Sequence, residues 1–192
     1  MKIKLLEELL APVTKSPAEA AKRLAEKFGT FLEIAEAETH TVSEAIGGDL
    51  STSIYIKLAV ALSSRRICDI FKLGKKHTEN EICDYLKALF FGLSVETVYM
   101  LSIDASGKVS ACDKAGEGTV NFSNVLPRKI IEIAKRRGAK SVIIAHNHPG
   151  GYAHPSEDDL AATKLLTELF IASGIALEAS YVVAGSECLK ID

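Results

Sequence analysis

One run of the sequence constrains the fold more than any other. Residues 141–146 read Ser-Val-Ile-Ile-Ala-His, a stretch that is short and almost wholly apolar. Such a run is typical of a central β-strand that is covered on both faces. A strand of this kind needs a sheet around it and further elements packed on that sheet, so the sequence predicts a layered α/β domain.

The segments around this run alternate between strand and helix patterns. Residues 96–116 read as two strands joined by the hairpin turn Asp-Ala-Ser-Gly-Lys. A last strand is expected at residues 176–185. Helices are expected at residues 79–93, 127–138 and 156–173, the first with Ile82, Leu86 and Leu89 or Phe90 on one side. Strands that alternate with helices predict a mixed α/β sandwich.

The first eighty residues carry almost no strand pattern. The first expected helix has Ser16 placed to cap it, Pro17 at its first position and Gly29 as its stop. Its apolar face comes from Ala20, Leu24 and Phe28. Further helices are expected at residues 31–37 and 51–71, with a turn at residues 43–51. We therefore divide the chain into a helical leader, residues 1–75, and an α/β domain, residues 76–192.

Composition bounds the class of protein. The chain has 192 residues, of which 47% are hydrophobic and 25% charged, as expected for a folded globular protein. Its apolar runs are too short to cross a bilayer and its start lacks a signal-peptide layout, so we expect a cytoplasmic protein without membrane contact. The net charge of −2 gives no bulk reason to bind nucleic acid. The four cysteines form no CxxC pair, and we expect them to be reduced and mostly buried.

The chemistry concentrates in residues 145–160, directly after the apolar run. His146 and His148 stand two apart, and in an extended chain such residues point to the same side, so both imidazoles can reach one ion. A Gly/Pro turn follows, and Asp159 lies in the first turn of the next helix. Two histidines and one carboxylate leave a fourth tetrahedral position for water, which is the layout of a catalytic zinc site. Zinc lowers the pKa of a bound water towards about 7.

A structural interpretation accounts for the same residues one by one. The spacing Ser156-x-x-Asp159 is that of a helix capping box, with Asp in place of Glu. A pair of histidines two apart also occurs in loops by chance. The combination after a buried strand favours the metal site, and capping is compatible with it. His154, inside the turn, is expected to face solvent rather than a metal.

The motif resembles that of the JAMM (JAB1/MPN+) metalloproteases, in which His-x-His-Pro is followed by Ser-x-x-Asp. It is still more similar to the bacterial RadC family, whose usual form is HNHPSG followed by PSxxD. The resemblance covers most of the chain, including a leader similar to a helix-hairpin-helix. It implies an α/β/α domain with a mixed sheet, of the architecture shared by JAMM proteins and cytidine deaminases. The HxE and PCxxC signature of the deaminases themselves is missing.

The resemblance also implies roles for individual residues. The zinc ligands would be His146, His148 and Asp159. Ser156 would help to hold the oxyanion of a tetrahedral intermediate. An upstream glutamate would act as general base; Glu96 is the first choice and Glu117 the competitor. The implied activity is hydrolysis of a peptide or isopeptide bond by metal-activated water, on a substrate that the sequence does not identify.

The chain departs from the RadC pattern at several positions. Gly150 replaces a serine, and Ala179 and Ser180 stand where the family commonly has an Asp-His pair, which puts the role of that pair in doubt. In the leader, the hairpin reads Gly47-Gly48-Asp49, and its negative side chain opposes phosphate binding. The alternative function, a DNA-repair-associated protein that binds DNA or a partner with little or no catalysis, is therefore expected to involve only weak DNA binding.

Overall fold

The computed structural model describes residues 1–118 and 126–191, and the chain divides into two compact units, Met1–Arg66 and Ile67–Asp192. The boundary that the sequence predicts between residues 75 and 76 falls inside the second unit. The reason is that Cys68 and Phe71 pack against the core of that unit. The Phe71 ring stacks on Tyr85, with ring centroids 4.0 Å apart.

The first unit contains only helices in its described structure. They are α1 (Ile3–Leu10), α2 (Pro17–Lys27), α3 (Phe31–Glu36), α4 (Thr39–Ala45) and most of α5 (Leu50–Ile70). The predicted apolar face of α2 is buried. Ser16 occupies the N-cap position of α2, as predicted, but its side chain makes no capping hydrogen bond. The predicted turn is narrower than expected because α4 continues to Ala45.

The second unit is built on a five-stranded mixed sheet. Its strands are β1 (Thr97–Ile103), β2 (Val109–Glu117), β3 (Ser141–Asn147), β4 (Ala176–Ala184) and β5 (Glu187–Ile191), in the order β2-β1-β3-β4-β5. β3 and β4 are parallel, and the other neighbours are antiparallel. Strand β5 was not predicted from the sequence. The Gly185-Ser186 pair that joins it to β4 is a hairpin signal that could have revealed it.

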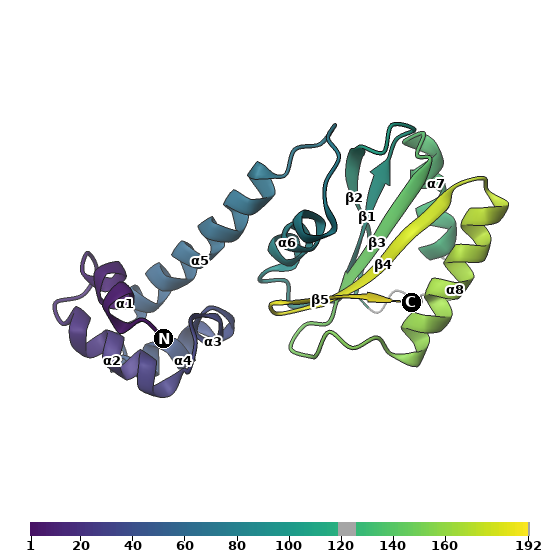
Figure 1. Cartoon of the computed structure of the whole chain (residues 1–192). Coiled ribbons are helices and arrows are strands. Elements are labelled where there is room, and N and C mark those ends of the chain that lie inside the picture. The colour runs from purple at the N-terminus through teal and green to yellow at the C-terminus, as the bar shows by residue number, and fades with distance from the viewer. Residues whose placement is uncertain (119–125, 192) are drawn as a thin grey trace. The chain divides into compact units, whose positions relative to one another are not determined.

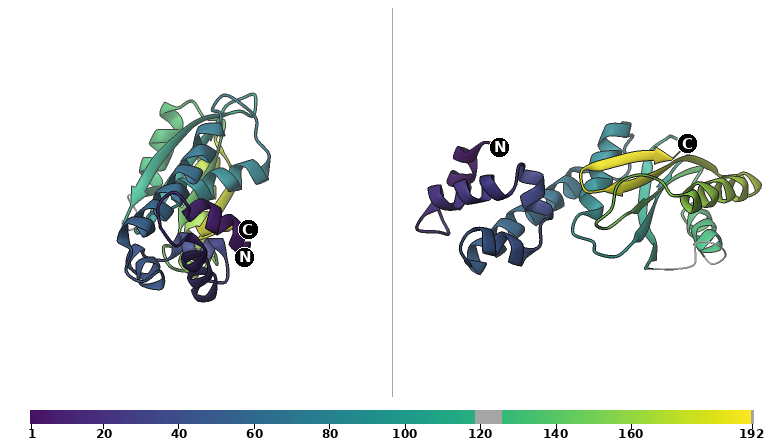
Figure 2. Two further views of the ribbon diagram at one scale, coloured as in Figure 1. Left: turned by 90° about the vertical axis from the view of Figure 1, so that its left-hand side faces the viewer. Right: turned by 90° about the horizontal axis from the view of Figure 1, so that it is seen from below.

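Helices cover both faces of this sheet, as predicted (Figure 1). Helix α6 (Glu79–Phe90) packs on one face, and α7 (Leu126–Arg136) and α8 (Glu157–Ala172) pack on the other. Figure 2 shows the same layers from two other directions. All seven residues of β3 are buried, and the adjacent Ile143 and Ile144 belong to the two different cores. The apolar run 141–146 is thus a strand covered on both faces.

The burial of the cysteines and the apolar character of the helices can be compared with what the composition predicts. No disulfide joins any of the four cysteines, but each is half-buried rather than buried, because they lie at the margin of the core beneath α6. Among the described helices, including the 21-residue α5, none combines the length and apolar character needed to cross a membrane.

Candidate metal centre

Strand β3 carries the two histidines to one end of the sheet. His146 is the penultimate residue of the strand and is buried. His148 follows the strand, and its backbone N–H donates to the Val183 carbonyl at 2.9 Å, which extends the pairing with β4 by one residue. The two Nε2 atoms lie 3.1 Å apart. The alternation of an extended chain therefore brings both imidazoles to one point.

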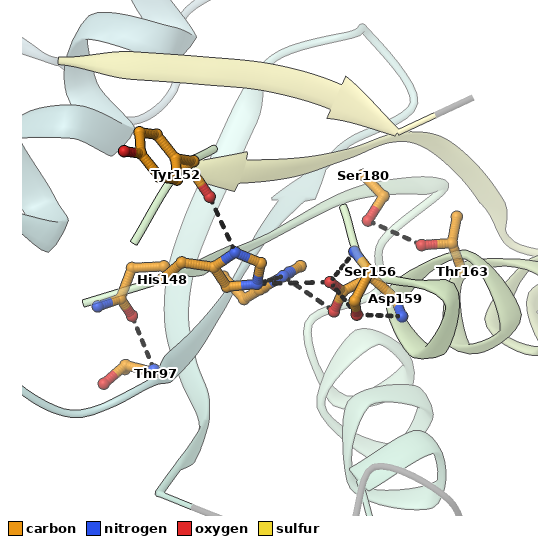
Figure 3. Close-up of polar contacts among 9 residues, drawn as sticks. Thr97, His148, Tyr152, Ser156, Asp159, Thr163 and Ser180 are labelled. Carbon is orange, nitrogen blue, oxygen red and sulfur yellow. Dashed lines mark hydrogen bonds and ion pairs between the residues drawn. The ribbon is translucent and has the colours of Figure 1, made fainter. Parts of the chain in front are cut away.

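The N-terminus of α8 brings Asp159 to the same point. Its Oδ1 lies 3.1 Å from His146 Nε2, and its Oδ2 lies 3.4 Å from His148 Nε2. The same carboxylate closes a capping box, since Oδ2 accepts from the Ser156 N–H at 2.8 Å and from the Ser156 hydroxyl at 2.6 Å (Figure 3). The Asp159 N–H donates in return to Ser156 Oγ at 3.2 Å. Capping and convergence on the histidines are both present in this structure.

The surroundings of Asp159 keep it ionised. Burial alone raises its pKa, but hydrogen bonds from His146 and Ser156 outweigh burial and hold the pKa well below its usual range. A carboxylate must be deprotonated to bind a metal. Asp159 therefore already has the ionisation state that a ligand requires at neutral pH.

Glu96 completes the group and Glu117 does not belong to it. Glu96 directly precedes β1 and is half-buried, and its carboxylate joins His146, His148 and Asp159 in a group whose ligand atoms all lie within 4.8 Å of one another. Glu117 ends β2, where its carboxylate pairs with Lys114 at 2.8 Å. The first choice between the two glutamates thus lies at the site, whereas the competitor points to a different partner.

The spacing of the donor atoms is compatible with one bound metal ion. A tetrahedral zinc with bonds of about 2.0–2.1 Å has ligand atoms about 3.3 Å apart. His146 Nε2 lies 3.1 Å from His148 Nε2 and 3.1 Å from Asp159 Oδ1, and His148 Nε2 lies 3.4 Å from the other carboxylate oxygen, Asp159 Oδ2. Two imidazoles and a carboxylate also suit zinc chemically. These three residues can hold one metal ion, with the Glu96 carboxylate beside it.

Two supporting contacts were not predicted. His148 Nδ1 lies 3.2 Å from the Tyr152 carbonyl oxygen, which can accept its proton and leave Nε2 to face the group (Figure 3). Asn147, between the histidines, is buried and reaches the segment around Glu96. A buried amide in an apolar strand is the sequence signal that could have drawn attention to Asn147; the carbonyl of Tyr152 has none.

The remaining predicted residues lie around the site in different ways. His154 is exposed and lies outside the described ligand group, as expected. Ser180 is buried on β4 and accepts from Thr163 Oγ1 at 3.3 Å, beside a cavity of about 20 Å³ that His146 and Asp159 also line. Ala179 instead belongs to the core beneath α6. Of the two positions of the family's Asp-His pair, only Ser180 therefore lies near the site, where it makes a small polar contact beside a water-sized space.

In the hairpin of the leader, the glycine N–H groups donate hydrogen bonds to nearby backbone carbonyls. Gly47 and Gly48 have positive φ angles of 81° and 89°, which glycine tolerates. Their N–H groups donate to the carbonyls of Glu44 and Ser43 at 3.1 and 2.8 Å. Asp49 Oδ1 accepts from the Thr52 N–H at 3.0 Å and so caps α5. The amides through which a helix-hairpin-helix would bind phosphate are thus engaged within α4.

Comparison with known proteins gives a consistent family signal. Residues 77–190 match the RadC-like JAB domain. A UPF0758 protein of Herminiimonas arsenicoxydans is 26% identical over 174 residues, which are 90% of this chain and 78% of that protein. A UPF0758 protein of Finegoldia magna is 31% identical over 151 residues, 77% of this chain and 66% of that protein. A UPF0758 protein of Cellvibrio japonicus is 27% identical over 180 residues, 93% and 80% of the two chains.

Proposed function

The chain belongs to the RadC-like JAB domain family, and we propose that it is a zinc-dependent hydrolase of peptide or isopeptide bonds. The convergence of two imidazoles and one carboxylate on a single point, beside a second carboxylate, carries this proposal. His146, His148 and Asp159 would hold the zinc. Glu96 would act as the general base.

The chemistry divides between the ion and the chain. Zinc supplies Lewis-acid polarisation and makes hydroxide available near neutral pH. Glu96 takes the proton of the attacking water and returns it to the leaving nitrogen as the C–N bond breaks, so that one carboxyl group and one amine are formed. Asp159 is held in place by Ser156. The Ser156 hydroxyl donates its hydrogen bond to Asp159 in this structure. To hold the oxyanion as well, the hydroxyl would have to rotate and donate to the substrate oxygen instead.

Metal content tests the first half of the proposal. Untagged wild-type protein is expected to carry about one zinc per chain by mass spectrometry, and His148→Ala to carry none. His154→Ala, an exposed histidine of the same loop, serves as the matched control and should keep its zinc. A wild type that stays free of zinc after loading would contradict the site.

Hydrolysis tests the second half. Cleavage of fluorogenic peptides and of isopeptide-linked lysine conjugates should be lost in Glu96→Gln while zinc content stays at the wild-type level. Glu117→Gln is the control, since its carboxylate pairs with Lys114, and it should cleave at the wild-type rate. Unchanged cleavage by Glu96→Gln would remove Glu96 as the base.

A further inference from the structure

Asn147 stands between the two histidines, but its side chain serves a different segment. The residue ends β3 and is 4% exposed. Its Oδ1 accepts from the Thr97 N–H at 2.7 Å, the contact marked at Thr97 in Figure 3. Its Nδ2 donates to the Val95 carbonyl at 3.4 Å. Asn147 therefore binds the chain on both sides of Glu96.

The backbone pairing of β1 with β3 does not reach Thr97, so a side chain provides the hydrogen-bond acceptor there. The β1–β3 ladder ends at the pair Val98 and His146, so Thr97 has no backbone partner on β3. Thr97 is fully buried, and a buried N–H needs an acceptor, which the Asn147 amide supplies. On the opposite side, the Gly118 N–H donates to the Glu96 carbonyl at 2.7 Å. Residues 95–97 are thus fixed between β2 and the end of β3.

These contacts fix the backbone from which the Glu96 side chain extends. Within residues 1–118 and 126–191, the carboxylate makes no hydrogen bond or ion pair of its own that would hold it at the site. Its place beside the histidines and Asp159 therefore follows from where the backbone of residues 95–97 is held. A displacement of about 1 Å at a reacting group can cost on the order of 100-fold in rate.

We propose that Asn147 is a positioning residue for Glu96: its amide sets residues 95–97 against the end of β3 and so directs the carboxylate to the His/Asp cluster. The inference rests on the proposed function, since it concerns the base of that reaction. An amide is required because the two contacts need one acceptor and one donor. An aspartate at position 147 would keep the contact with Thr97 and set a second oxygen against the Val95 carbonyl.

A spectroscopic cycle tests the proposal without a substrate. Full-length protein is loaded with Co²⁺, and the visible absorption of wild type, Asn147→Ala, Glu96→Gln and the double variant is compared. We expect Asn147→Ala to change the spectrum in the same direction as Glu96→Gln, and the double variant to match Glu96→Gln alone. Thr163→Val, which removes another side-chain hydrogen bond next to the site, should keep the wild-type spectrum.

The rate of hydrolysis of the fluorogenic peptides is then measured for the same four proteins. Asn147→Ala should lower kcat by about 10-fold to 100-fold with zinc content retained, and should cause no further loss in the Glu96→Gln background. An unchanged spectrum, loss of the metal, or an equal loss in both backgrounds would overturn the proposal. If Asn147→Ala does not fold, Asn147→Asp takes its place. A wild type that binds cobalt but cleaves nothing would refute the proposed function, while the spectra would still report on Glu96.

Discussion

At the scale of single residues, Asp159 shows how one carboxylate combines a structural and a chemical role. It caps α8 through Ser156 and faces both histidines. The capping alternative raised by the sequence is therefore part of the site rather than a competitor to it. The position of the carboxylate depends on the capping box, which makes the contribution of Ser156 measurable.

Ser156→Ala should weaken zinc binding as well as the helix. Thr78 and Glu81 form a second capping box at the start of α6. Neither residue belongs to the metal group, which consists of Glu96, His146, His148 and Asp159, so Thr78→Ala is a matched control. Loss of a Ser or Thr N-cap costs about 1 kcal/mol, and both variants should lose a similar amount of stability in urea unfolding of the metal-free protein. A competitive zinc titration should show weaker binding for Ser156→Ala only. Equal zinc affinities in the two variants would contradict this coupling.

Asp159 should also make the metal-free protein sensitive to acid. Its pKa is lowered in the folded state, so its contribution to stability is fully present above its unfolded pKa of about 3.9 and is lost as the pH falls towards the lower folded pKa. The gap in Tm between wild type and Asp159→Asn is therefore expected to narrow as the pH falls below about 4. Asp158→Asn, at the exposed neighbour, should show no such narrowing. A gap that widens as the pH falls below about 4 would mean that folding raises the pKa of Asp159 instead of lowering it.

At the scale of elements, β3 determines the layering of the second unit. Ile143 and Ile144 are both 3% exposed and face opposite cores. Ile→Val substitutions in a core cost about 0.5–1.5 kcal/mol. Ile143→Val and Ile144→Val should therefore each lower the free energy of unfolding in this range, measured in urea. Leu189→Val on the exposed edge strand β5 should change it much less. If either Ile→Val substitution left the free energy of unfolding unchanged, the face of β3 that carries it would not be packed.

At the scale of the whole molecule, every residue of the metal group lies in the second unit. Residues 67–192 expressed alone should therefore fold and bind one zinc per chain, the stoichiometry also expected of the full chain. Zinc at 100 times its Kd should stabilise both proteins by about 2.7 kcal/mol, which is the increment for a ligand that binds the folded state and not the unfolded chain. Thermal unfolding with and without zinc measures this. A fragment that folds but needs the first unit for zinc binding would contradict the prediction.

The first unit gives a separate prediction about DNA. Its glycine amides are engaged within α4, and the Asp49 carboxylate lies at the hairpin with its pKa lowered by hydrogen bonds from Thr52. We expect weak binding or none to duplex DNA at low salt in a gel-shift titration, and Asp49→Asn should not create tight binding because the amides stay engaged. Strong binding that falls steeply with salt would favour the DNA-associated alternative.

The sequence by itself determined the local features of this protein. The apolar run 141–146 requires a strand buried on both faces, and the spacing of His146 and His148 brings both side chains to one side. The Ser156-x-x-Asp159 spacing likewise encodes a capping box through contacts within one helical turn. These features depend on neighbours only a few residues away, and the pattern of residue types suffices to predict them.

Only the tertiary structure decided what depends on strand register. Glu96 and Glu117 are both glutamates near strand ends, and the pairing of β1 with β2 and β3 places only the first at the metal group. The contact of Asn147 with residues 95–97 joins positions about fifty residues apart. A shift of one residue in register would turn each of these side chains to the other face of the sheet. Long-range register, which no local pattern encodes, therefore decides which glutamate joins the two histidines and Asp159 and which segment Asn147 contacts.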